Sequence, residues 1–291
     1  MDGIFVIYKE KGYTSHDVVA VVRRLLHTKK VGHTGTLDPD AEGVLPICVG
    51  RATRAADMLP GEGKAYTAGV RLGLITDTQD TTGAVLETRM VNVSEAQIRA
   101  AAAEFVGQIR QIPPMYSAIK VNGKKLYEYA RKGEPVERPV RTIQIDAIAV
   151  QNVTKTGYFM DIICSKGTYI RTLCHDMGQR LGCGAAMETL TRTRSGGFSI
   201  EQAVTLSQLE QAVADGRAEA LCHPIDSVFA CYPAMQLDEA LTVRIRNGAV
   251  STVPEPCGRY RVYGADGGFL CVGEVVRQGN RRVIKTVKNF F

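Results

Sequence analysis

The spacing of apolar residues along the chain predicts a mixture of strands and amphipathic helices. Residues 4–7 form a short apolar run, and residues 64–72 place apolar side chains at alternate positions, which is the period of a half-buried strand. Residues 18–26 place Val and Leu at helical spacing instead, behind a capping box formed by Thr14 and Asp17. Both periods recur along the chain, so the pattern predicts an α+β fold.

Further elements follow the same two patterns. Ser94 and Gln97 form a second capping box, ahead of a helix that ends at Gly107. The dipeptide Asn122-Gly123 separates two short polar strands and indicates a tight hairpin. The remaining predictions are strands at 44–49, 140–150 and 158–164, helices at 170–181 and 205–214, and a break at 61–63.

The C-terminal part of the chain differs from the rest in pattern and in charge. Residues 258–276 read as short strands around an Asp-Gly turn, which predicts a small β barrel. Residues 241–291 contain nine Lys or Arg and only three acidic residues, whereas the first 240 residues are neutral in sum. We therefore expect a main domain over 1–232 and a small basic domain over 233–291. Its charge fits either polyanion binding or a solubilising surface.

Composition limits the class of protein. With 291 residues, 45% of them hydrophobic, the chain can bury a large core without disulfides. The eight cysteines have no CxxC spacing, so neither a zinc ribbon nor a disulfide framework is indicated. The N-terminal apolar run is too short for a signal peptide or a membrane span. We expect a cytoplasmic monomer with no membrane contact.

The densest group of turn-forming residues lies between residues 31 and 46. This stretch reads Val-Gly-His-Thr-Gly-Thr-Leu-Asp-Pro-Asp-Ala-Glu-Gly-Val-Leu-Pro and carries three glycines. Pro39 fixes the turn directly after Asp38. The pattern predicts a structured loop with Asp38 at its tip.

Gly32–Pro39 followed by Gly43–Pro46 closely resembles the catalytic-aspartate motif of the TruB-type tRNA pseudouridine-55 synthases. The resemblance implies that Asp38 is the nucleophile or base that converts a uridine in the T-arm of tRNA to pseudouridine, without a cofactor. It also implies a mixed, mainly antiparallel catalytic sheet of pseudouridine synthase type with flanking helices, and a PUA-like C-terminal β barrel. Lys9 matches the lysine of a further turn that is found in this family, although Glu10 stands where the family usually has a proline.

Three more segments match the family in the expected order. Lys64-Ala-Tyr66 resembles the second motif, which implies that Tyr66 stacks on the target base and is a candidate for proton removal. Lys166–Arg171 resembles the segment whose arginine pairs with the catalytic aspartate. Arg171 also lies in the first turn of a predicted helix, where a cation opposes the dipole and calls for a carboxylate partner. Leu190–Gly196 resembles the last motif, which implies that Leu190 lines the active site.

The remaining candidates concern RNA. The base must leave its stack, and His33 could fill the space left behind. The predicted hairpin would present its lysines beside tyrosines, which suits an RNA surface, although lysines also protect an edge hairpin from aggregation. The predicted RNA contacts are His33, Lys9, Lys64, Leu190, Lys120, Lys124, Lys125, Arg192 and Arg194. Asp77 and Asp80 occupy a polar loop in which acids commonly bind their own backbone.

Two other interpretations of the loop lack the sequence motifs that they require. A metallohydrolase would need His33, Asp38 and Asp40 as ligands, but the five histidines lack HxH or HExxH spacing. No Gly-x4-Gly-Lys-Ser/Thr phosphate loop is present. A non-enzymatic RNA-binding protein, in which Asp38 only caps a turn, remains the alternative.

Overall fold

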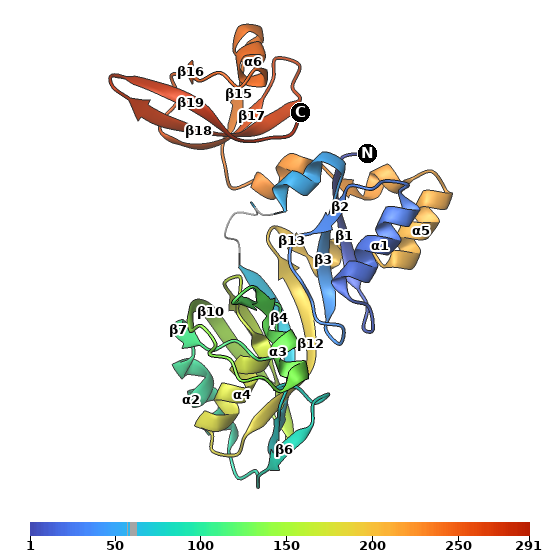
Figure 1. Ribbon diagram of the computed structural model, residues 1–291, viewed down its shortest axis with the longest axis vertical. Coiled ribbons are helices and arrows are strands. Elements are labelled where there is room, and N and C mark those ends of the chain that lie inside the picture. Colours follow the sequence, from blue (N-terminus) through green and yellow to red (C-terminus); the bar gives the residue numbers. More distant parts are fainter. Residues whose placement is uncertain (57, 59–62) are drawn as a thin grey trace. The chain divides into compact units, whose positions relative to one another are not determined.

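A computed structural model describes residues 1–56, 58 and 63–291. The predicted break at 61–63 therefore lies mostly outside the described residues. The chain forms two compact units (Figure 1). Unit 1 comprises Met1–Pro39, Gly43–Pro60 and Gly196–Phe291, and unit 2 comprises Asp40–Glu42 and Gly61–Ser195.

Unit 2 is built on five antiparallel strands. Their order is β12 (Ala185–Ser195), β4 (Lys64–Leu72), β11 (Gly157–Cys164), β10 (Arg141–Gln151) and β7 (Gly107–Gln111). The strands predicted at 64–72, 140–150 and 158–164 are confirmed. The predicted mainly antiparallel sheet is thus present, because each of these neighbouring pairs is antiparallel.

Two helices pack on this sheet. α2 (Glu95–Glu104) contacts β10, and α4 (Ile170–Arg180) contacts β12. Both halves of the predicted Ser94–Gln97 capping box are present. Two hairpins extend unit 2: β5 (Leu74–Thr76) pairs with β6 (Val85–Thr88), and β8 (Lys120–Val121) with β9 (Lys124–Lys125). α3 (Leu126–Lys132) follows β9.

The turn of the β8–β9 hairpin has the predicted chemistry. Asn122 has a φ of +51° and Gly123 a φ of +82°. A two-residue turn with positive φ at both positions matches the twist of the flanking strands, and Asn-Gly is the dipeptide that tolerates it best.

In unit 1, β1 (Gly3–Lys9) and β3 (Glu42–Val49) pair antiparallel. β2 (Val31–His33) adds to β3, and β14 (Cys222–His223) adds to β1. The helices α1 (Ser15–Leu25) and α5 (Leu206–Ala214) contact each other and confirm the two helices predicted there. This part also contains the short strand β13 (Phe198–Ser199) and the 3-10 helices η1 (Gly50–Ala55), η2 (Ile200–Gln202), η3 (Ala218–Leu221) and η4 (Ile225–Phe229).

The C-terminal part of unit 1 is a five-stranded sheet that includes the predicted strands. The order is β15 (Ala234–Gln236), β17 (Gly258–Tyr263), β18 (Phe269–Gln278), β19 (Arg281–Asn289) and β16 (Ser251–Thr252). α6 (Glu239–Arg246) was not predicted, although Asp238 caps its first turn.

The C-terminal sheet shares a core with the first strands of the chain. Val272 and Phe290 are buried in one cluster with Ile4, Val44 and Phe229. Tyr232, at the predicted domain boundary, is packed too, since its ring stacks on Phe229 with the ring centroids 6.3 Å apart. The boundary predicted near residue 232 therefore carries extensive packing on both sides. Within the described residues, no helix is both long and apolar enough to cross a bilayer.

Candidate active site

The loop that carries Asp38 is attached to the N-terminal segment on both sides of the aspartate. Before it, Leu37 is buried, and its N–H donates to Oγ of Ser15 at 2.9 Å. The same hydroxyl donates to the carbonyl of Leu37 at 3.1 Å. Ser15 is the first residue of α1, so the loop is anchored to the start of a packed helix.

The other side of the loop is held by the end of β1. The carbonyl of Pro39 accepts hydrogen bonds from Nζ of Lys9 at 3.1 Å and from the N–H of Gly12 at 2.9 Å. Lys9 is fully buried, and its ammonium also donates to the carbonyl of Glu10 at 3.1 Å. A buried charge is stable only when it is hydrogen-bonded. Lys9, predicted as an RNA contact, thus lies against the backbone of the loop beside Asp38.

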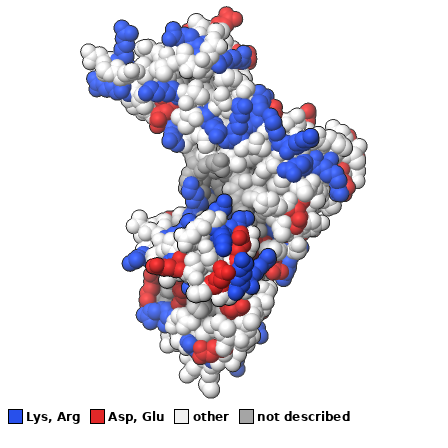
Figure 2. All heavy atoms as spheres, viewed as in Figure 1, with Lys and Arg blue, Asp and Glu red and all other residues white. Residues whose placement is uncertain are grey.

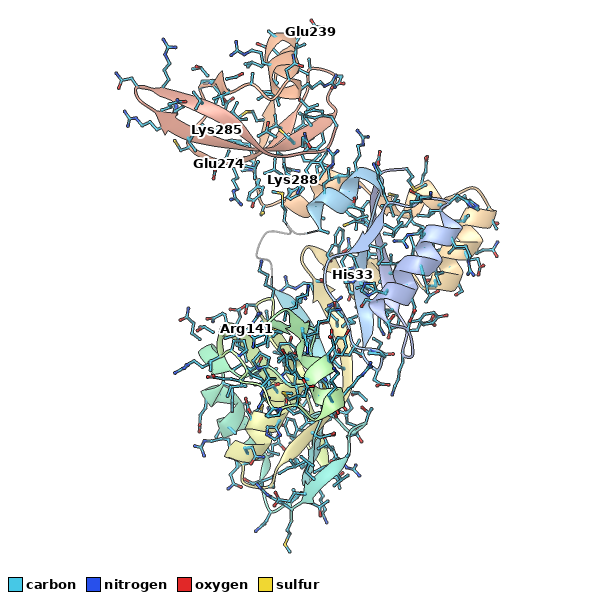
Figure 3. All side chains as sticks on the ribbon, in the orientation of Figure 1. His33, Arg141, Glu239, Glu274, Lys285 and Lys288 are labelled. Atoms are coloured by element: carbon cyan, nitrogen blue, oxygen red, sulfur yellow. The ribbon has the colours of Figure 1, made fainter. Side chains whose placement is uncertain are left out.

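His33 ends β2 and lies partly buried in unit 1 (Figure 3). Its ring meets the ring of exposed His16 edge to face, with centroids 5.4 Å apart. His16 belongs to α1, so the histidine pair lies at the same helix start that anchors Leu37. The sequence did not single out His16.

In unit 2, Tyr66 and Arg192 are direct neighbours across β4 and β12. Tyr66 is buried, and the exposed fraction of Arg192 is zero. Burial lowers the pKa of Arg192, while its charge interaction and hydrogen bond with Tyr66 act in the opposite direction. Arg192 was predicted to contact RNA, and the structure buries it beside Tyr66; its contact with RNA stays a prediction.

A β-bulge separates the two arginines of this strand. Strict alternation would place Arg192 and Arg194 on the same face of β12. The register shifts between them, so Arg192 pairs with Tyr66 and half-buried Arg194 pairs with Ala65. Tyr66 and Ala65 are consecutive in β4 and point to opposite faces, so the two arginines do as well. Leu190, predicted to line the site, is buried on the same strand.

Lys64 begins β4, two residues before Tyr66, and is half-buried. Burial lowers its pKa to about 8, and the nearby charge of Arg192 contributes to the shift. This amine consequently changes charge around pH 8, whereas an exposed lysine stays charged to about pH 10.

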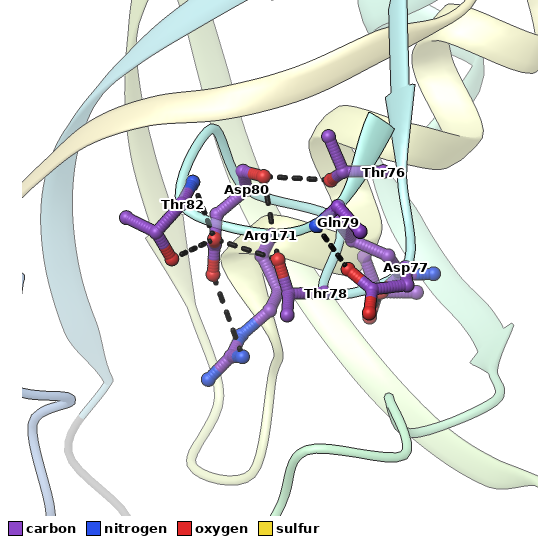
Figure 4. A network of polar contacts seen from close by, with 9 residues as sticks. Thr76, Asp77, Thr78, Gln79, Asp80, Thr82 and Arg171 are labelled. Atoms are coloured by element: carbon purple, nitrogen blue, oxygen red, sulfur yellow. Dashed lines mark hydrogen bonds and ion pairs between the residues drawn. The ribbon is translucent and has the colours of Figure 1, made fainter. Parts of the chain in front are cut away.

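Arg171 forms an ion pair with an acid that the sequence left without a role. Its Nη1 lies 3.6 Å from Oδ2 of Asp80 (Figure 4), and the side chains are 8% and 17% exposed. The carboxylate of Asp80 also accepts from the hydroxyl of Thr78 at 2.7 Å. It accepts further from the hydroxyl of Thr82 at 2.6 Å and from the N–H of Thr82 at 3.1 Å.

The loop that presents Asp80 is closed by its own side chains (Figure 4). Oδ1 of Asp77 accepts from the N–H of Ala84 at 2.8 Å, and the hydroxyl of Thr76 donates to the carbonyl of Asp80 at 2.6 Å. The two acids thus differ in role, since Asp77 closes the loop and Asp80 faces Arg171. The adverse position of Arg171 in its helix did signal a carboxylate partner, but not which one.

The lysine hairpin forms a compact cationic and aromatic cluster within unit 2. Nζ of Lys124 lies 5.7 Å from the ring centre of Tyr129, and Nζ of Lys125 lies 5.4 Å from that of Tyr127. Arg131 covers the same Tyr127 ring at 5.3 Å. Lys120 is exposed beside them.

A second basic surface lies on β18 and β19 (Figures 2 and 3). Glu274 faces Lys285, but Arg277 lies directly opposite Arg282. Like charges at opposed strand positions repel each other. Both arginines are exposed, as is neighbouring Arg281.

The predicted site residues therefore fall into two groups. Unit 1 contains His33, Lys9 and the loop of Asp38, and unit 2 contains Tyr66, Arg171, Leu190 and the other candidates from residues 64 to 194. Within the units, Lys9 meets the Asp38 loop, Arg192 meets Tyr66, and Arg171 meets Asp80. The pairing of Asp38 with Arg171 and Tyr66 stays a prediction.

Comparison with solved structures identifies the class of fold. The chain is similar to the structure titled "Crystal Structure of a Cbf5-Nop10-Gar1 Complex", with a TM-score of 0.77 and 26% identity over 99% of this chain and 85% of that chain. It is also similar to "Crystal structure of the archaeal box H/ACA sRNP Nop10-Cbf5 complex", with a TM-score of 0.74, 26% identity and coverage of 99% and 86%. The fold is that of the pseudouridine synthases.

Sequence comparison narrows this class to one family. Residues 23–170 match the family described as TruB family pseudouridylate synthase (N terminal domain), and residues 171–230 match the tRNA pseudouridylate synthase B C-terminal domain. A relative from Levilactobacillus brevis, named tRNA pseudouridine synthase B, is 50% identical over 88% of this chain and 87% of its own length. One of the same name from Alkaliphilus oremlandii is 43% identical over 100% and 99%. The chain belongs to the TruB family of pseudouridylate synthases.

Proposed function

We propose that this enzyme converts the uridine at position 55, in the T-arm of tRNA, to pseudouridine, with Asp38 as the nucleophile or base. The observation that carries the proposal is the construction of the Asp38 loop in a chain of this family. Ser15 holds the residue before the aspartate, and Lys9 holds the residue after it. Loops fixed in this way hold a reacting group in one geometry, which is a large part of catalysis.

The reaction needs only groups that the chain supplies. The bond between N1 of uracil and C1′ of the ribose breaks, the base turns, and C5 bonds to C1′. N1 gains a proton and C5 loses one, so no redox partner or cofactor enters. Asp38 acts at the sugar or the base, and Tyr66 stacks on the uracil and accepts the C5 proton. The guanidinium of Arg192 supports that role, because it favours negative charge on the phenol oxygen.

Arg171 is proposed to orient Asp38 while Asp80 orients Arg171. A guanidinium has five donors, so it can hold one carboxylate and still present N–H groups to a second. The ion pair with Asp80 fixes one side of the guanidinium within unit 2. The remaining donors of the guanidinium are then available to the reacting carboxylate.

Recognition of the RNA is proposed to use three surfaces. His33 occupies the space left by the flipped base, at an unstacking cost of a few kcal/mol that binding must offset. The hairpin with Lys120, Lys124 and Lys125 binds phosphates, and its tyrosines are available for stacking. The C-terminal sheet acts as a PUA-like RNA-binding domain. Opposed Arg277 and Arg282 support this role, since a bound phosphate would relieve their repulsion.

The test is release of tritium from uridine labelled at C5 in a T-arm hairpin, together with mapping of pseudouridine in full tRNA. Asp38→Asn should lower turnover by at least about 1,000-fold, because the amide can act neither as nucleophile nor as base. Binding of the hairpin should stay within a few-fold. Asp40→Asn is the matched control, since this exposed neighbour carries the same charge. Activity of the Asp38 variant close to wild type would refute the assignment.

A further inference from the structure

The helix that carries Arg171 begins without the usual means of stabilisation. Its N-cap residue, Tyr169, makes no side-chain capping hydrogen bond, and the first turn contains no acid. Arg171 adds a positive charge where the helix dipole disfavours one. The position of this turn must therefore be fixed by groups outside the helix.

Gln111, the last residue of β7, supplies one of these groups. Its Nε2 donates to the carbonyl of Tyr169 at 3.0 Å, and its Oε1 accepts from the N–H of Tyr169 at 2.8 Å. The side chain thus binds the N-cap residue through both ends of its amide, much as a neighbouring strand would. Only 2% of Gln111 is exposed, so water cannot readily replace these bonds.

Gln79 holds the other side of the turn. Its Oε1 accepts from the hydroxyl of Thr172 at 2.7 Å, one residue after Arg171. Gln79 itself has a φ of +67°, which side-chain-bearing residues rarely adopt. The backbone is kept there by β12, because the carbonyl of Gln79 accepts from the N–H of Met187 at 3.0 Å. A strained backbone at such a place indicates a requirement on its side chain.

We infer that Gln79 and Gln111 form a clamp that orients the guanidinium of Arg171, and that they are positioning residues of this enzyme. One amide fixes the residue two before Arg171, and the other fixes the residue directly after it. Asp80, next to Gln79 in the chain, then receives the guanidinium. The inference rests on the proposed function for its kinetic consequences, but the clamp itself can be measured without turnover.

The first test replaces Gln111 with glutamate and with leucine. An ionised glutamate still accepts from the N–H of Tyr169 but cannot donate to its carbonyl, whereas the neutral acid can do both. Both variants should lower kcat by about 10- to 100-fold at pH 8, since small displacements of a catalytic group have effects of that size. KM should change less than threefold. Burial at this position raises the pKa of the introduced carboxyl, so the neutral acid gains population as the pH falls from 8 to 6. Relative to wild type at each pH, Gln111→Glu should therefore recover at least fivefold between pH 8 and pH 6, and Gln111→Leu should not.

The second test separates positioning from stability. Gln79→Asn keeps an amide residue that tolerates positive φ, but its side chain is shorter by one methylene and falls short of Thr172. We expect a melting temperature close to that of wild type and a kcat about tenfold lower. This variant also carries the test if a replacement of Gln111 does not fold.

Hydrogen exchange supplies the measurement that does not depend on activity. The amide of Tyr169 should exchange at least tenfold faster in Gln111→Leu than in wild type, because its acceptor is gone. If wild type showed no turnover, but the Tyr169 amide still exchanged faster in Gln111→Leu than in wild type, the proposed function would be refuted and the clamp would stand. Turnover of Gln79→Asn and of the folded Gln111 variants within twofold of wild type would overturn the clamp. A loss without recovery of Gln111→Glu at low pH would also overturn it.

Discussion

Replacing Asp80 with asparagine removes one charge from the ion pair with Arg171 and keeps the size of the side chain. The carboxylate lies 3.6 Å from the guanidinium, and both groups are mostly buried. At an effective dielectric constant of about 20, two unit charges at this separation attract each other by about 4 to 5 kcal/mol. Desolvation of both groups opposes this gain, so the net effect is smaller.

Part of the attraction is replaced in the variant. Asparagine can still accept hydrogen bonds from Thr78 and Thr82, which together make three with the carboxylate. We therefore expect Asp80→Asn to lower the free energy of unfolding by about 1 to 2 kcal/mol. The guanidinium of Arg171 would lose one fixed contact, and kcat should fall by about 100-fold.

Urea unfolding and single-turnover kinetics on a T-arm hairpin measure the two effects separately. A double-mutant cycle with Arg171→Met should give a coupling energy of about 2 kcal/mol in the activation free energy. Glu87→Gln is the control, since Glu87 pairs with Arg89 on the exposed β6 hairpin. A coupling energy near zero, or kcat of Asp80→Asn within threefold of wild type, would refute the argument.

Three further predictions concern buried and exposed cations. Lys9→Met should lower the free energy of unfolding by about 2 to 3 kcal/mol and slow turnover, since it leaves the carbonyl of Glu10 unpaired beside the Asp38 loop. A kcat of Lys9→Met equal to that of wild type would contradict this prediction. Because the pKa of Lys64 is lowered to about 8, its charge should favour RNA binding below pH 8 and be lost above it; Lys64→Met should flatten that profile. The unfolded chain binds more protons between pH 8 and 10.5, so wild type should gain stability over Lys64→Met as pH rises through this window. Arg281→Ala with Arg282→Ala should reduce the slope of log affinity against log salt by about one to two, and an unchanged slope would exclude phosphate contacts there.

The prediction for Arg281 and Arg282 uses point variants and not a deletion of the C-terminal sheet, because that sheet shares a core with the rest of unit 1. Removing the C-terminal sheet would take Val272 and Phe290 out of the cluster that contains Ile4 and Phe229. Such a deletion would expose apolar surface of the first strands. Exposed arginines on β18 and β19 can be changed without disturbing that packing.

Local signals in the sequence determined much of the secondary structure. The capping boxes at Thr14 and Ser94, the Asn122-Gly123 turn and the alternation along β4 each depend on neighbouring residues alone. The loop around Asp38 was equally visible, because turn chemistry is encoded by Gly and Pro over a short span. The resemblance in motifs named the family, which the comparisons confirmed.

Tertiary structure decided the surroundings of the site residues. Lys9 and Arg192 are charged, and the sequence pattern predicted surface positions for them, but β1 and β12 carry them into the interior. Asp80 and Arg171 are distant in the chain, and so are Gln111 and Tyr169. No periodicity or turn pattern can specify such pairs, because each depends on where separate elements meet. The sequence thus determined which groups are available for chemistry, and only the packing of helices and strands decided which of them hold one another in place.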